Sequence, residues 1–226
     1  MPIRAQLLTD IEQVLGSAVR PSLTSASAAD DIYEAYLFSI VISAARLEGA
    51  AVRYLCVSGG RPDIFVFRTG PGHIGSRVHN YGYGEIEFAG CPVLEAHVGV
   101  RVSGHSNVLH ECDISVLLKE EADVCRAGGP ALIAPRSSKV LIAIEAKYFT
   151  KDIPLSLGRG FLGLTRDLSA DRVFFVANRG GRSVEKLLSH KKQLWEHQIS
   201  PFDQVSVTRL RNAFQTAFKD YKAREM

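Results

Sequence analysis

Apolar residues recur every three or four positions near both ends of the chain, the spacing of an amphipathic helix. This pattern predicts helices over 3–19, 31–47, 184–198 and about 205–224, with Asp30 as the N-cap of the second. The Pro, Ser, Thr and Ala residues after the first of these have the composition of a linker. The N-terminal part is therefore expected to be a short helical appendage.

The middle of the chain instead contains short apolar runs separated by Gly, Pro and Ser turns, which is typical of antiparallel strands. Strands are predicted at 64–67, 81–88, 93–102, 110–118, 139–149 and 172–178. A polar loop at about 119–138 and a glycine-rich helix at 154–168 separate the later strands. An α/β fold, in which a central mixed sheet is flanked by helices, accounts for this order.

We expect three parts: an N-terminal helix and linker at 1–29, a core with hairpin insertions at 30–200, and a C-terminal helix packed on the core at 201–226. The chain has 226 residues, of which 46% are hydrophobic and 23% charged, and its net charge is only +3. These are values of an ordinary globular domain, so they exclude a disordered or fibrous chain.

The cysteines and the N-terminal segment indicate the cellular compartment of the protein. The four cysteines lack C-x-x-C spacing and have apolar or small neighbours, as reduced thiols of an intracellular protein do, and a zinc site is disfavoured. The N-terminus lacks the unbroken apolar stretch of an export signal or a membrane anchor. We therefore expect a cytoplasmic protein without a membrane partner.

The candidate catalytic residues lie in two apolar segments, 110–118 and 140–148, which the polar loop at about 119–138 separates. Side chains of a strand alternate between its faces, so Glu145 and Lys147 share one face, and Asp113 shares a face with Glu111 and Ser115. If the two strands pair, Asp113, Glu145 and Lys147 converge.

Carboxylates among Ile, Val and Ala side chains need a compensating charge, because burial of an unpaired charge costs several kcal/mol or more. A salt bridge or a divalent cation would supply it. Carboxylate oxygens and water suit Mg²⁺. Lys147 would then orient or deprotonate a water, or stabilise negative charge on a phosphate.

Asp113 followed by Glu145-Ala-Lys147 resembles the motif of the PD-(D/E)xK nuclease superfamily, and this is the only E-x-K in the chain. The resemblance covers roughly residues 30–195 and implies a restriction-endonuclease-like fold that cleaves phosphodiesters with metal bound by Asp113 and Glu145. Mg²⁺ is the implied cofactor, for which Mn²⁺ would substitute. The family's leading helix often adds a Glu, for which Glu34 is the match, because its neighbours at helical spacing are apolar.

The sequence departs from the family pattern at two points. Cys112 stands where the family has Pro, and the 31 residues between Asp113 and Glu145 must loop out between adjacent strands. Pro62-Asp63 is a literal Pro-Asp, but it lies far upstream, and we prefer Asp113. Glu111 would assist Asp113 or substitute for it. His110 is a candidate to contact the site residues without binding the metal itself.

Basic residues are concentrated around the E-x-K. Between Arg136 and Lys192 there are 12 basic and 5 acidic residues, a net charge of +7, whereas residues 1–110 carry a net charge of −2. This distribution favours a polyanionic partner or else reflects solvated helix faces. The resemblance to the nuclease superfamily implies a nucleic acid as this partner, with DNA preferred over RNA. The main candidates for phosphate contacts are Lys151, Arg159, Arg166 and Lys191; Arg179, Arg182 and Lys192 belong to the same surface. A homodimer would suit cleavage of both strands.

Several alternatives stay open at this stage. The glycines of 158–163 fit no phosphate-loop motif and are expected to allow close packing of a helix on the sheet. The aromatic segment 80–84 is either a base-stacking surface or a turn with packed rings. For the whole protein, the rivals to a metal-dependent endonuclease are an inactive nuclease-like subunit for nucleic-acid binding or assembly, and a protein whose Asp113, Glu145 and Lys147 only form a buried ion pair.

Overall fold

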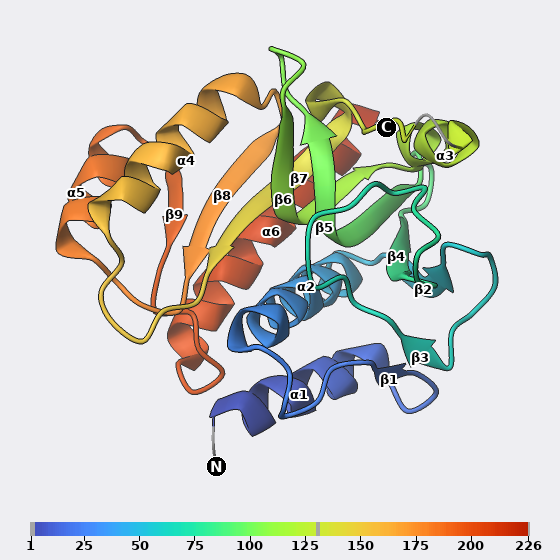
Figure 1. Ribbon diagram of the computed structural model, residues 1–226, viewed down its shortest axis with the longest axis horizontal. Coiled ribbons are helices and arrows are strands. Elements are labelled where there is room, and N and C mark those ends of the chain that lie inside the picture. Colours follow the sequence, from blue (N-terminus) through green and yellow to red (C-terminus); the bar gives the residue numbers. More distant parts are fainter. Residues whose placement is uncertain (1–2, 130–131, 226) are drawn as a thin grey trace.

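A computed structural model describes residues 3–129 and 132–225, which form a mixed α/β structure around a seven-stranded sheet (Figure 1). The strands of this sheet, in spatial order, are β2 (Ala51–Cys56), β4 (Gly82–Glu87), β5 (Leu94–Ser103), β6 (Leu109–Leu118), β7 (Val140–Lys147), β8 (Arg172–Ala177) and β9 (Leu194–Glu196). The expected mixed sheet flanked by helices is therefore confirmed.

The described residues include six α-helices: α1 (Ile3–Leu15), α2 (Ala29–Leu47), α3 (Lys119–Ala127), α4 (Leu155–Asp167), α5 (Arg182–His190) and α6 (Gln204–Glu225). Helices α2 and α6 cover one face of the sheet, where Phe214 meets Phe174 edge to face at 5.1 Å. Helices α4 and α5 cover the other face beside β7 to β9, where Phe161 meets Phe175. The sheet therefore lies between two helical layers (Figure 1).

Two kinds of connection build the sheet. Neighbouring strands from β2 to β7 are antiparallel, whereas β7, β8 and β9 run parallel and are linked by the crossover helices α4 and α5. As a result, the carboxyl end of β7 lies beside the amino-terminal half of β6. This is where the segments containing Asp113 and Glu145 meet.

The strand alternation predicted for β7 is present in the fold. Ile142, Ile144 and Ala146 belong to the core under α2 and α6, whereas Ala143 belongs to a second apolar cluster on the opposite face. Since Glu145 and Lys147 share a face with Ala143, they point away from α2 and α6. Helix α1 packs on α2, and its Leu7 and Ile11 join the main core.

Three predictions about elements are wrong. The expected loop 119–138 begins with α3, because Ala122 and Cys125 bury one face of a helix, and it ends in a 3₁₀ turn at Ser137–Lys139. The expected helix 184–198 ends at His190, since Lys192 adopts a left-handed φ of 54°, and the chain then pairs with β8 as β9. Asp30 is not an N-cap: α2 is capped at Ala28, and Asp30 lies in its first turn, where an acid favours the helix dipole.

Two strands differ from expectation at the edge of the fold. β2 forms an edge of the sheet, and the sequence patterns did not single it out. β3 (Ile64–Phe65) is shorter than the predicted strand 64–67 and pairs with β1 (Arg20–Pro21) in a separate two-stranded sheet. Within the described ranges, no helix combines the length and the apolar character that a membrane crossing requires.

Candidate active site

The strands β6 and β7 separate where Asp113 lies. The backbone pairing of the two strands ends with Ile114 and Ile144 and does not extend to Asp113 and Glu145. Past that point the backbone N–H of Ala146 donates to Asp113 Oδ2 at 2.6 Å. The Asp113 carboxylate therefore takes the place of a backbone acceptor, which fixes its position at the fork between the two strands.

Lys147 contacts both of the other motif residues, Asp113 and Glu145. Its Nζ lies 2.7 Å from Glu145 Oε1 and 3.8 Å from Asp113 Oδ2. The side chain of Asp113 is only 10% exposed, whereas those of Glu145 and Lys147 are 24% and 23% exposed. The convergence expected from strand alternation is thus present, and it takes the form of a direct ion pair.

Two further carboxylates surround this pair. Glu111 shares the face of Asp113 on β6, and Glu34 lies in the first part of α2. Tyr33, next to Glu34, meets Tyr148 after β7 with ring centroids 5.5 Å apart, which holds the start of α2 against the end of β7. Glu34 makes no hydrogen bond or ion pair within residues 3–129 and 132–225, so only charge and burial link it to the site.

Burial and mutual repulsion keep protons on this cluster. Burial, and then the charge of Asp113, raise the pKa of Glu34 to about 9. Burial raises the pKa of Asp113 to about 7, although Lys147 lowers it, and Glu145 adds to the rise. For Lys147 burial favours the neutral amine, but Asp113 and Glu145 outweigh it and raise the pKa, so the ammonium persists at neutral pH. A single lysine faces four carboxyl groups, so its one positive charge could not balance all four as carboxylates, and protons on Glu34 and Asp113 relieve part of the repulsion.

The motif residues line a cavity of about 430 Å³ together with α4. His110, Glu111, Asp113, Glu145 and Lys147 form the strand side of this cavity, and Gly160, Phe161, Gly163 and Leu164 form the helix side. Its size lies within the ~300–1,000 Å³ of typical ligand pockets. The ion pair of Lys147 and Glu145 is therefore bordered by open space.

The cavity offers carboxylate oxygens as ligands for a metal ion. No group of three or more His, Cys, Asp and Glu side chains is arranged to hold a metal among the residues that the structure describes. Asp113 and Glu145 provide two carboxylates, and in those same residues Asp113 Oδ1 and Glu145 Oε2 accept no hydrogen bond. Mg²⁺ is commonly bound through one or two carboxylates, with water and substrate phosphate as the other ligands, so this donor set fits Mg²⁺.

His110 lines the cavity and contacts Asp167 of α4. Its Nε2 lies 2.6 Å from Asp167 Oδ2, and Ser106 donates to the same carboxylate through its hydroxyl and its backbone N–H. Hydrogen bonds from Ser106 and His110 lower the pKa of Asp167 to about 2. This network ties the turn between β5 and β6 to the last turn of α4. Sequence reasoning found His110 but missed Asp167, which no motif marks.

The glycines of α4 do not all have the predicted role of packing on the sheet. A Cβ at Gly158 would lie 3.1 Å from Val184 Cγ1 of α5, so this glycine allows two helices to approach. Gly160 and Gly163 are exposed, and a Cβ at either would meet nothing within 4 Å. They line the cavity instead. Their spacing of three residues was a sequence signal for one helix face, but it could not tell which neighbour that face meets.

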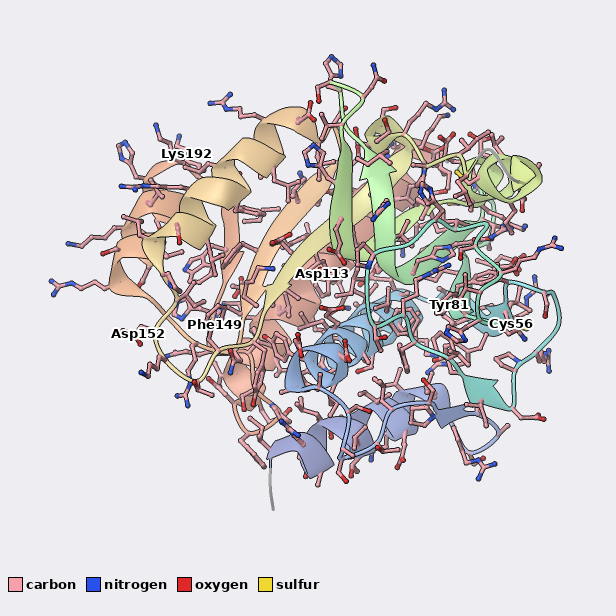
Figure 2. All side chains as sticks on the ribbon, in the orientation of Figure 1. Cys56, Tyr81, Asp113, Phe149, Asp152 and Lys192 are labelled. Atoms are coloured by element: carbon pink, nitrogen blue, oxygen red, sulfur yellow. The ribbon has the colours of Figure 1, made fainter. Side chains whose placement is uncertain are left out.

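The basic residues singled out from the sequence are exposed but lie outside the cavity lining. Arg159 and Arg166 lie on α4, Lys151 follows β7 and Lys191 follows α5. None of the four forms an ion pair within the described residues. Figure 2 shows Lys192 at the outer edge of the molecule, well away from Asp113. Arg159 and Arg166 share their helix with Gly160 and Gly163, which do line the cavity.

Burial and position bear on the aromatic segment, on Asp63 and on Cys112. Tyr83 is buried and stacks on His97, and the guanidinium of Arg68 lies 3.8 Å from the ring centre of Tyr81, so the aromatic segment consists of packed rings. Figure 2 shows Tyr81 well apart from Asp113. Asp63 is exposed ahead of β3 and does not line the cavity. Burial raises the pKa of the Cys112 thiol, as expected for a core cysteine.

Comparison with known proteins gave no match: no protein-family model, no curated protein and no solved structure is similar to the chain. The residues at the fork between β6 and β7 are therefore the basis of the functional proposal.

Proposed function

We propose that the protein is a metal-dependent nuclease that hydrolyses phosphodiester bonds, with DNA preferred over RNA. The observation that carries this proposal is the shared cavity of Asp113, Glu145 and Lys147, in which the carboxylates outnumber the single ammonium. The resemblance of these residues to the PD-(D/E)xK motif supports it. Mg²⁺ bound by Asp113 and Glu145 would offset their repulsion, polarise the phosphate and activate a water.

The residues of the chain would have distinct roles in this reaction. Asp113, anchored by the Ala146 N–H, and Glu145 would bind and orient the metal. Lys147 would keep its proton on Nζ, because its pKa is raised, and would stabilise negative charge on the phosphate as an ammonium. Glu34, whose pKa is about 9, would hold a proton near the site at neutral pH and support the cluster from α2.

A specific observation favours a second candidate. Lys147 already neutralises Glu145 through a direct ion pair, and a site kept in that form would be a nuclease-like subunit for nucleic-acid binding or assembly without turnover. In the first candidate, Lys147 must leave Glu145 when metal and substrate bind. The two candidates differ in whether loss of Glu145 abolishes an activity or leaves binding unchanged.

Cleavage assays distinguish the two candidates. The purified protein is incubated with duplex DNA, single-stranded DNA and single-stranded RNA in Mg²⁺ or in EDTA. We expect cleavage of DNA in Mg²⁺ only, and a loss of roughly 10²–10⁴-fold in Glu145→Gln and Lys147→Met, as for a group that acts in the chemical step. The matched controls are Glu185→Gln and Lys186→Met, which change the same residue types on the exposed side of α5.

Equal cleavage by wild type, Glu145→Gln and Lys147→Met would overturn the nuclease assignment at this site. Salt-dependent DNA binding that Glu145→Gln leaves unaltered, without cleavage by wild type, would establish the second candidate instead.

A further inference from the structure

The helix side of the cavity contains two glycines whose presence the fold itself does not explain. Gly160 and Gly163 lie inside α4, where glycine is the least favourable residue after proline. Gly158 of the same helix is needed for contact with α5, but a Cβ at Gly160 or Gly163 would meet open space. Since alanine would fit at both positions and would favour the helix, packing within the protein does not require these glycines.

What the two glycines share is the cavity of the motif residues. Gly160 and Gly163 line it from α4, and Asp113, Glu145 and Lys147 line it from the strands. A helix without side chains at these positions presents its bare backbone to the carboxylates. Another backbone can therefore approach the helix as closely as glycine permits.

Positive charge lies beside Gly163 on the exposed side of α4, outside the cavity lining. Arg159 and Arg166 are seven residues apart, which places them on the same side of α4 and about 10 Å apart along its axis, with Gly163 between them. Both are exposed, and neither has an ion-pair partner within residues 3–129 and 132–225. Guanidinium groups match phosphate oxygens in geometry and charge.

We propose that Gly160 and Gly163 of α4, with Arg159 and Arg166 on the exposed side of the helix next to Gly163, form the surface on which the cleaved DNA strand lies opposite Asp113 and Glu145. The inference rests on the proposed function and adds how the substrate reaches the site. The glycines admit the sugar-phosphate backbone into the cavity, and the arginines bind phosphates on either side of the bond to be cut. Gly160 and Gly163 are thus positioning residues.

The proposal predicts opposite effects on stability and on activity. Gly160→Ala and Gly163→Ala should each raise the melting temperature by about 2–4 °C, because alanine favours a helix interior. The same variants should lower kcat/KM for DNA cleavage, and Gly163→Leu, with a larger side chain, should lower it by about tenfold or more. A variant that becomes more stable and less active cannot be explained by damage to the fold.

Asn212→Leu is the matched control, since it places a leucine on an exposed position of α6, the helix on the opposite face of the sheet. It should leave kcat/KM unchanged. Arg159→Ala and Arg166→Ala should each weaken DNA binding and reduce the slope of log affinity against log salt by about one.

DNA binding in EDTA, measured by fluorescence anisotropy, separates this inference from the proposed function. If wild type cleaves DNA and Gly163→Leu cleaves it equally fast, the surface is wrong while the nuclease stands. If wild type binds DNA without cleaving it and Gly163→Leu binds at least tenfold more weakly, the nuclease is wrong while the surface stands. Unchanged binding by Gly163→Leu in that case, or absence of both binding and cleavage in wild type, overturns the surface.

Discussion

The ammonium of Lys147 lies 2.7 Å from Glu145 Oε1, two residues away on the same face of β7. Asp113 of the neighbouring strand approaches the same ammonium at 3.8 Å. The Lys147 ammonium is therefore the counter-charge of the two carboxylates that would bind the metal in the proposed function.

Removal of Lys147 should destabilise the protein. In Lys147→Met the surrounding carboxylates lose their counter-charge, and we expect a loss between the ~1 kcal/mol of an exposed ion pair and the ~3–5 kcal/mol of a fully buried one. The measurement is urea unfolding at pH 7.5 in EDTA. Lys139→Met, which removes an ion pair between Lys139 and the exposed Glu120, should cost less than about 1 kcal/mol. Equal losses in the two variants would mean that the pair at the site has no special role in stability.

Asp113 should stabilise the fork between β6 and β7 through its hydrogen bond. Asp113→Asn keeps an acceptor for the Ala146 N–H, whereas Asp113→Ala leaves this buried donor without a partner. We therefore expect Asp113→Ala to be less stable than Asp113→Asn by about 1–3 kcal/mol in urea unfolding. Both variants remove the same charge, so their difference isolates the hydrogen bond. Equal stability would show that Ala146 finds another partner.

The effect of Glu34 on stability should depend on pH. Its pKa is raised from 4.5 to about 9 in the folded protein, so the folded state keeps a proton that the unfolded state releases above about pH 4.5. Wild type consequently loses stability as the pH rises from about 4.5 to 9, and Glu34→Gln lacks the part of this loss that comes from Glu34 while keeping the part that comes from Asp113.

The stability gained by Glu34→Gln should therefore grow between pH 5 and pH 9 and then level off. Thermal unfolding in EDTA across this range measures the gain. A gain that stays constant with pH, or that falls, would contradict the buried and repulsive surroundings assigned to Glu34.

The parts of the site that follow local rules could be predicted from the sequence. Strand alternation placed Glu145 and Lys147 on one face, and helical spacing around Glu34 indicated its inward direction. These patterns depend only on neighbours along the chain. The same reasoning predicted a mixed sheet with helices, because runs of strands and helices alternate in order.

What the sequence did not predict depends on contacts between distant segments. The end of α5 before Lys192 and the pairing of β9 with β8 come from tertiary packing, which overrides helical periodicity. The role of Asp167 requires the turn at Ser106 to meet α4, 61 residues away. For Gly160 and Gly163, the sequence indicates a shared helix face but not the cavity beside it.

The location of a bound metal tests the central claim most directly. Crystals of the protein soaked in Mn²⁺, with diffraction data collected at an anomalous wavelength, should show a peak between the carboxylates of Asp113 and Glu145, with Lys147 Nζ moved away from Glu145 Oε1. An intact pair of Lys147 and Glu145 with no peak in the cavity at saturating Mn²⁺ would contradict the account.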